Sequence, residues 1–244
     1  MYINTTGIVL RETAYRDSSK ILTVLAGAEG KLTVSAKGAL RRNSKLAAVT
    51  QLLAFSEMTL YSSRDRWTLT EARSLEQFTG LRDDIRLLAL GSYFAELTEA
   101  VADEDSPGRE LLPLILNALF ALSEKIKTPE MVKPAFELRL MAASGFAPSI
   151  GECGACGEEN PLTAYLDFEG GTIICGRCSQ GGGAFLSAAA LKAARYVTGC
   201  ELKKLLSFTL GESALSELSN AAEGYLLSQL DRKFRTLDFY NSLT

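Results

Sequence analysis

The first 75 residues alternate between short apolar runs and polar connections, a pattern typical of β-strands. Gly7–Leu10 and Ile21–Leu25 are apolar runs, and Lys31–Ala36 alternates polar and apolar residues with a period of two. Phe55–Tyr61 and Trp67–Ala72 form a fourth and a fifth run. We therefore predict five short strands in the N-terminal part of the chain.

The connection between the third and fourth predicted strands has helical spacing. Ser44 can cap a helix start, and the apolar residues up to Leu53 fit one or two helical turns. A helix at this place among five strands is the usual order of an OB-fold barrel, which often binds single-stranded nucleic acid. An SH3-like barrel also has five strands and stays open as an alternative.

From Leu81 onward the apolar residues recur with a helical period. Asp83 and Asp84 suit the start of a helix, Pro113 fits only a first turn, and Gly145 can end a helix. The predicted helices cover approximately residues 85–101, 111–122, 129–145, 187–197 and 213–232. The fold class is therefore α+β and multidomain, with a five-stranded OB-fold barrel followed by an α-helical domain.

Four of the five cysteines form two Cys-x-x-Cys pairs, Cys153 with Cys156 and Cys175 with Cys178, separated by 18 residues. This spacing is typical of a structural zinc site. The chain has no histidine, so the site would be all-cysteine, and four thiolates leave no open position for water or substrate. Disulfides or redox pairs are the alternative, but a redox pair normally lies in a βαβ pattern, which is absent here.

The spacer between the cysteine pairs resembles a hairpin around Gly170 and Gly171, and Gly181–Gly183 is expected to form a flexible exit. We therefore expect three domains. The barrel domain covers residues 1–80, the helical domain covers 81–149 and 181–244, and an inserted zinc-ribbon module with four cysteine ligands covers 150–180.

Charge is distributed unevenly along the chain. The net charge is −3, yet residues 1–80 carry 11 Lys/Arg against 7 Asp/Glu, and the remainder carries 15 against 22. Such asymmetry can mark a nucleic-acid contact. The apolar run Leu111–Leu122 is too short to span a membrane, and the first ten residues lack the pattern of a secretory signal. We expect a cytoplasmic protein without a membrane partner.

The basic residues concentrate in one segment. Between Glu29 and Glu57 the chain has no acidic residue but has five cations, which we predict to bind DNA phosphates: Lys31, Lys37, Arg41, Arg42 and Lys45. A merely solvated basic loop is the alternative. Phe55, Tyr61 and Trp67 could stack bases, although aromatic residues of a small barrel more often fill its core.

Catalytic machinery is not apparent in the sequence. The most common general base is missing because there is no histidine, and no phosphate-binding glycine motif precedes a helix. We therefore do not expect an enzyme.

Four stretches resemble the RecO family of bacterial DNA repair and recombination mediator proteins. They are Gly7–Leu10 with Tyr15–Leu25; Gly30-Lys31, Ala36–Gly38 and Arg41–Leu46; Ala135–Met141 with Gly145–Pro148; and Arg235–Tyr240. Together they span most of the chain. One departure is that Gln51–Phe55 lacks the proline usual in the family, which puts the local turn in question.

The resemblance implies the same barrel, helical domain and zinc ribbon, with one structural Zn²⁺. It also implies binding of single- and double-stranded DNA, annealing of complementary strands, and loading of RecA together with RecR on DNA coated by single-strand binding protein. The resemblance also suggests the C-terminal tail of that protein as a ligand. Lys133 and Arg139, beside Phe136 and Leu140, are the expected cradle, and an Arg139 that simply faces water is the alternative. The alternative is an interaction adaptor that docks partners through its helical domain without touching DNA.

Overall fold

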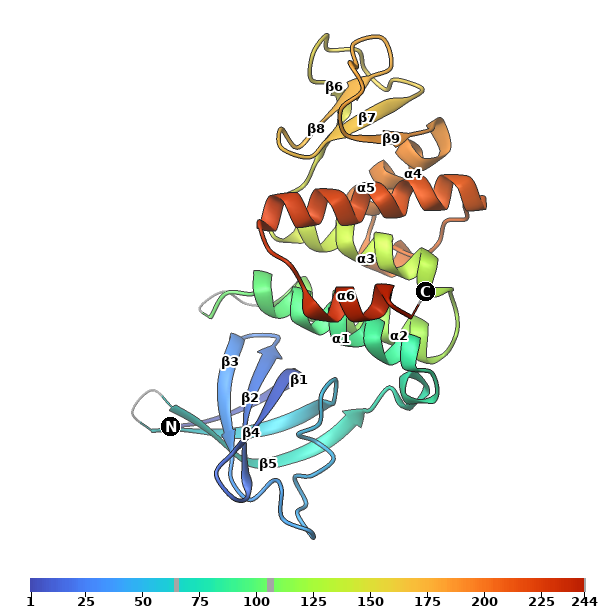
Figure 1. The fold of residues 1–244 in the computed structure, drawn as a ribbon. Coiled ribbons are helices and arrows are strands. Elements are labelled where there is room, and N and C mark those ends of the chain that lie inside the picture. Colours follow the sequence, from blue (N-terminus) through green and yellow to red (C-terminus); the bar gives the residue numbers. More distant parts are fainter. Residues whose placement is uncertain (64–65, 105–107, 244) are drawn as a thin grey trace. The chain divides into compact units, whose positions relative to one another are not determined.

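The structure of the protein is a computed structural model that describes residues 1–63, 66–104 and 108–243 (Figure 1). The chain divides into two compact units, Met1–Glu124 with Phe234–Thr244, and Lys125–Lys233. The first unit therefore groups the barrel with the helices at Ile85–Val101, Leu111–Ser123 and Arg235–Asn241, whereas the three domains expected from the sequence stay a prediction. Among the described residues, no helix is both long and apolar enough to cross a membrane.

The first unit contains a closed barrel of five strands. They are β1 (Tyr2–Tyr15), β2 (Ser19–Ala26), β3 (Gly30–Ala36), β4 (Phe55–Ser63) and β5 (Arg66–Glu76). The strand order is β1-β2-β3-β5-β4, and the barrel closes through a parallel pairing of β3 with β5. This order is that of an OB-fold, so the predicted fold class is confirmed.

Apolar and polar residues alternate along β3, and this alternation places apolar side chains inside the barrel. Leu32, Val34 and Ala36 of β3 point into a core, whereas the residues between them lie nearer the surface. The same core receives Val24 from β2 and Met58 from β4, both almost fully buried. The period of two in the sequence therefore reflects a real division between inside and outside.

The segment between β3 and β4 does not form the expected helix. It is a series of turns, in which the amide of Ala47 donates to Ser44 and that of Gln51 donates to Ala48. The segment is also held against β1, since the amide of Leu53 donates to the carbonyl oxygen of Val9 at 2.9 Å. Leu53 has a φ of 66°, a left-handed conformation through which a right-handed helix cannot continue.

The helices of the first unit are α1 (Ile85–Val101), α2 (Leu111–Ser123) and α6 (Arg235–Asn241), with a 3-10 turn at Thr79–Asp83. Asp84 caps α1 by accepting a hydrogen bond from the amide of Arg86. Tyr93 on α1 and Phe234 just before α6 are both buried, and their rings meet edge to face with centroids 6.1 Å apart. α6 was not predicted from the sequence.

The second unit contains α3 (Pro129–Ala143), α4 (Ala188–Gly199) and α5 (Glu212–Leu230), with a short 3-10 turn at Leu202–Lys204. Its sheet has the order β6-β8-β7-β9 and is formed by β6 (Ser149–Cys153), β7 (Ala164–Asp167), β8 (Thr172–Cys175) and β9 (Ala184–Leu186). Ser187 caps α4 as expected, by accepting from the amide of Ala190.

The exit from the ribbon is more constrained than expected. Gly183 has a φ of 83° and leads directly into β9, and any side chain there would collide with the carbonyl group of Leu166. Glycine is needed at this position for close approach of two backbones.

Candidate nucleic-acid interface and metal centre

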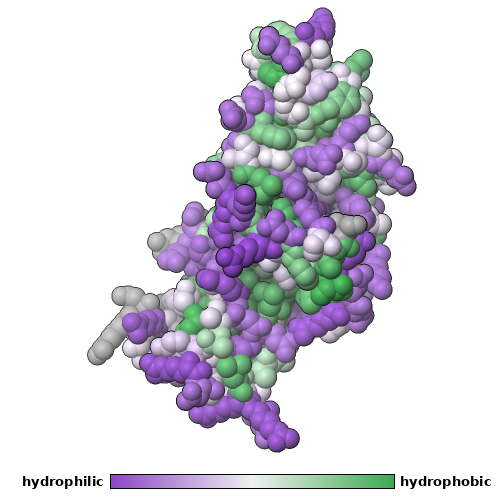
Figure 2. Space-filling view, viewed as in Figure 1, coloured by the Kyte–Doolittle hydropathy of each residue, from purple (hydrophilic) through white to green (hydrophobic). Residues whose placement is uncertain are grey.

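Four of the five predicted DNA-binding residues lie together on the loop after β3. Lys37, Arg41, Arg42 and Lys45 are all exposed, and none forms an ion pair with another described residue. Figure 2 shows hydrophilic side chains gathered at the end of the barrel where this loop lies in Figure 1. Four unpaired cations on one loop can meet phosphate groups without first breaking an internal ion pair.

This basic loop is fixed to the barrel at several points. The amide of Leu40 donates to the carbonyl oxygen of Ser18 at 3.0 Å, and the amide of Gly38 donates to the hydroxyl oxygen of Ser19 at 3.4 Å. Further along, Lys20 ion-pairs with Glu12 and donates to the carbonyl oxygen of Thr50. The loop is therefore ordered before any ligand arrives, which lowers the entropic cost of binding.

Lys31 is separated from the other four cations because it lies at the opposite end of β3. Its Nζ donates to the carbonyl oxygen of Glu99 at 3.2 Å, and its amide donates to that of Asp103 at 3.1 Å. Lys31 thus binds carbonyl groups at the C-terminal end of α1, where a cation is favourable.

The three aromatic residues singled out in the sequence differ in exposure. Trp67 packs against the barrel core and Phe55 is half-buried. Tyr61 is 38% exposed, and its ring lies against that of Tyr2, with centroids 4.9 Å apart. Trp67 and Phe55 therefore contribute mainly to the barrel, as expected for aromatic residues in a small fold.

The four predicted metal ligands converge at one place in the second unit. The Sγ atoms of Cys153, Cys156, Cys175 and Cys178 all lie within 4.8 Å of one another, and those of Cys156 and Cys175 are 3.9 Å apart. A Zn–S distance of about 2.3 Å places tetrahedral sulfurs about 3.8 Å apart. The cluster therefore fits a tetrahedral ion, and its thiols are free rather than joined in disulfides.

A backbone hydrogen bond favours the thiolate form of Cys153 in this cluster. The amide of Cys175 donates to Sγ of Cys153 at 3.2 Å, and this bond is the main reason that the pKa of Cys153 falls to about 6. Hydrogen bonding with the Cys156 side chain is the largest cause that raises the pKa of Cys178 to about 12. A bound divalent cation would oppose this by favouring every thiolate.

The two residues predicted to hold a partner's tail do not form an exposed cradle. Lys133 is 4% exposed and forms ion pairs with Glu137 at 2.8 Å and Glu223 at 2.7 Å. Arg139 is half-buried and donates to the carbonyl oxygen of Thr198 at 2.9 Å. The charge of Lys133 is therefore already paired with two carboxylates of the second unit.

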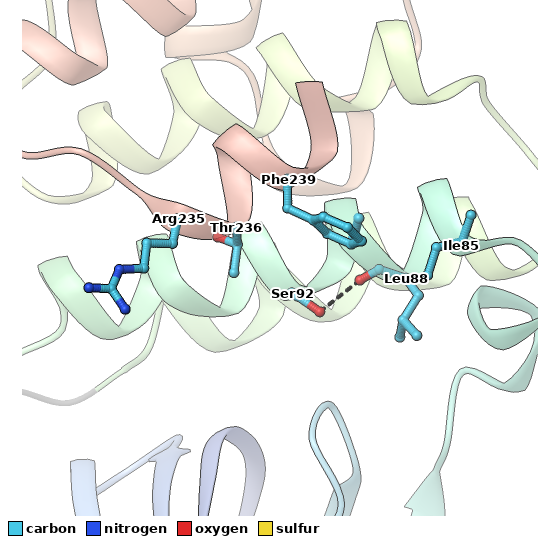
Figure 3. Close-up of a pocket in the computed structure, with 7 residues that line it drawn as sticks. Ile85, Leu88, Ser92, Arg235, Thr236 and Phe239 are labelled. Carbon is cyan, nitrogen blue, oxygen red and sulfur yellow. Dashed lines mark hydrogen bonds between the residues drawn. The ribbon is translucent and has the colours of Figure 1, made fainter. Parts of the chain in front are cut away.

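A pocket of about 280 Å³ lies between α1 and α6, both in the first unit (Figure 3). Its walls are mainly apolar, and Ile85 and Phe239 remain 55% and 48% exposed. Arg235 lines the same pocket and carries its only cationic side chain among the lining residues. The sequence did not predict this site because α1 and α6 are far apart along the chain.

Together, these features define a class of protein in which an OB-fold barrel carries a basic loop and a separate unit carries a four-cysteine cluster. The family models of the Recombination protein O N terminal and C terminal domains match residues 1–78 and 82–238. The chain belongs to the RecO family of DNA repair proteins.

Three relatives illustrate the similarity, each described as DNA repair protein RecO. The protein of Acetivibrio thermocellus is 32% identical over 244 residues, covering 99% of this chain and 97% of its own length. That of Caldicellulosiruptor bescii is 30% identical, covering 98% and 97%. That of Symbiobacterium thermophilum is 31% identical, with the same coverage of 98% and 97%.

Proposed function

We propose that this protein is a recombination mediator that binds single- and double-stranded DNA without sequence specificity and anneals complementary strands. With RecR, it would help to load RecA on DNA coated by single-strand binding protein. Membership of the RecO family supports a role in DNA repair. The observation that carries the DNA-binding part is the anchored basic loop, whose four cations form no ion pair within the described part of the chain: Lys37, Arg41, Arg42 and Lys45.

Phosphate contacts explain the type of binding that we propose. Cations on a loop neutralise phosphates and release counterions, which gives affinity for any strand irrespective of its bases. The same neutralisation favours annealing, because it reduces the repulsion between two strands. The protein would bind and anneal DNA in the cytoplasm, at the nucleoid.

Replacing all four loop cations by alanine tests this proposal. Since each lost phosphate contact flattens the log–log salt dependence by about 0.7 on single strands, we expect the slope to fall by about 2.8 in magnitude. The measurement is the affinity of the full-length protein for a labelled oligonucleotide over a series of salt concentrations.

A double variant, Lys192→Ala with Lys203→Ala, serves as a control because both side chains are exposed in the second unit. It should leave the slope unchanged, whereas Arg41→Ala with Arg42→Ala should reduce it by about 1.4. An unchanged slope in the quadruple variant would reject the site. A wild-type protein that binds no DNA would favour the alternative, an adaptor that only docks partners.

Zinc is the metal that we propose for the cysteine cluster. All-thiolate, closed four-coordinate sites are typical of structural Zn²⁺, and the sulfur positions suit its tetrahedral geometry. The four ligands lie at or just after the C-terminal ends of β6 and β8, which pair in parallel, so the ion would join these two neighbouring strand ends.

The pocket between α1 and α6 is the place where we propose that the acidic, apolar C-terminal tail of single-strand binding protein docks. Its apolar walls suit the tail's apolar end, and Arg235 suits a carboxylate. Phe239→Ala and Arg235→Ala should each weaken binding of a tail peptide about tenfold, measured by fluorescence anisotropy. Arg139→Ala should have no effect, and the reverse result would restore the cradle on α3 in place of the pocket.

A further inference from the structure

The turn between β1 and β2 is joined to the basic loop, although neither the sequence pattern nor the proposed phosphate contacts assign it a role. Tyr15 and Ser19 face each other across this turn, and the basic loop binds it through Ser18 and Ser19. The bond from the amide of Leu40 to the carbonyl oxygen of Ser18 is 3.0 Å long. The turn and the loop therefore form one surface at one end of the barrel.

This surface carries exposed apolar groups beside its cations. The side chain of Tyr15 is 44% exposed, and that of Leu40 is 45% exposed. Burial of such side chains in the barrel would be favourable, but Tyr15 lies at the end of β1, where Thr13 and Ala14 are exposed as well. A large aromatic ring at the surface, on a turn bonded to a loop whose cations form no ion pair with another described residue, suits a ligand that is both flat and anionic.

A cation lies over the ring of Tyr15. The guanidinium carbon of Arg16 lies 5.0 Å from the centroid of the Tyr15 ring, within the range of a cation–π interaction. Arg16 itself is exposed and has a φ of 54°, so the backbone of the turn directs its side chain back over the neighbouring ring. Arg16 therefore adds a positive charge at the ring while leaving much of the ring open to solvent.

We propose that Tyr15, with Arg16 against its ring, is a stacking site for one unpaired base of single-stranded DNA. The proposal rests on the DNA-binding function proposed above and adds a preference for single strands. Lys37 and Arg41, on the loop bonded to the turn, bind phosphates of the same strand. A base within a duplex is already stacked on its neighbours and cannot reach the tyrosine, whereas an unpaired base can.

The exposed tyrosine at the start of β1, Tyr2, lacks this combination of an open ring and a neighbouring arginine. Tyr2 is 66% exposed, but its ring lies against that of Tyr61. Tyr2 is also at the opposite end of the same 14-residue strand. It is therefore a matched control, since it is an exposed tyrosine of β1 to which the inference assigns no base.

The test uses the full-length protein and three probes of equal length: a single strand of mixed sequence, the same strand made abasic, and the duplex. Tyr15→Ala should weaken binding of the single strand about tenfold, because one stacked base is lost. Its salt slope should stay that of the wild type, because no charge is removed. Binding of the abasic strand and of the duplex should stay within about twofold of the wild type.

Two further variants make the result specific. Tyr15→Phe keeps the aromatic face and should bind the single strand like the wild type, and Tyr2→Ala should also behave like the wild type. The inference is overturned if Tyr15→Ala binds the single strand normally, if it weakens single strand and duplex equally, or if Tyr2→Ala has the same effect. If Tyr15→Ala binds the single strand like the wild type while the loop variants still lower the salt slope as expected, the stacking site alone is rejected. The proposed phosphate contacts then stand.

Discussion

Lys133 shows how the role of a single residue depends on distant parts of the chain. It is one turn before Glu137 on α3 and also ion-pairs with Glu223, which lies 90 positions away on α5. Burial lowers the pKa of Lys133, but the Glu137 and Glu223 carboxylates more than offset this and raise the pKa above 10.5. The sequence around Lys133 gives no sign of Glu223, so a buried position could not be predicted.

We predict that Lys133→Met lowers the free energy of unfolding by about 3–5 kcal/mol, because Glu137 is 0% exposed and loses its buried ion-pair partner. Urea denaturation at pH 7 measures this. Lys192→Met, at an exposed position of α4, should change stability by less than about 0.5 kcal/mol. An equally small change in both variants would show that the α3–α5 ion pairs do not stabilise the fold.

The ion pairs of Lys133 should also make the stability of the protein depend on pH. Because the folded-state pKa of Lys133 is raised above 10.5, its contribution is fully present below that pH and is lost as the pH rises through the folded-state value. The difference in stability between wild type and Lys133→Met should therefore narrow in strongly alkaline solution.

Elements with a local signal could be predicted, and those fixed by tertiary contacts could not. All five barrel strands were predicted because apolar runs or alternation are visible within a few residues. The cysteine cluster was predicted because each Cys-x-x-Cys supplies two ligands locally. The segment at 44–53 has helical spacing, but Val49 and Thr50 are β-branched and the backbone is drawn toward β1, so it forms turns. The seven-residue α6 is too short for its period to stand out.

The face of α1 shows the same limit. Ile85 is among the apolar residues that recur along the predicted helix at 85–101, yet it is exposed and lines the pocket, while Tyr93 and Leu90 are fully buried. The pocket depends on α6, which is held by the hydrogen bonds of Thr236 to Glu96 across 140 positions. Periodicity identifies a helix, but it does not show which neighbours will cover each face.

At the scale of the whole molecule, the two candidate sites belong to different compact units. The basic loop and Tyr15 lie in Met1–Glu124, and the cysteine cluster lies in Lys125–Lys233. All four cations of the basic loop belong to the first unit. Stability of the second unit and DNA affinity of the first should therefore be separable.

We predict that Cys153→Ser, or removal of the metal by a chelator, destabilises the second unit by at least about 3 kcal/mol, because the free energy of structural zinc binding is also free energy of folding. Affinity for a single strand at 25 °C should stay within about twofold, or about 0.4 kcal/mol, for each molecule whose barrel is folded. Thermal unfolding, zinc content and oligonucleotide binding are measured on the same preparation.

Cys200→Ser provides the control, because Cys200 is a free thiol outside the four-cysteine cluster. It should keep both the metal and the stability of the wild type, so an effect of Cys153→Ser alone can be assigned to the cluster. Loss of DNA binding in Cys153→Ser with the barrel still folded would instead place the ribbon in the DNA interface. Arg177 would then be the first residue to replace, since its side chain is 78% exposed although it ion-pairs with Glu158 at 3.0 Å. Arg177→Ala would lower the salt slope by about 0.7 in that case and would leave it unchanged if the ribbon is only a framework.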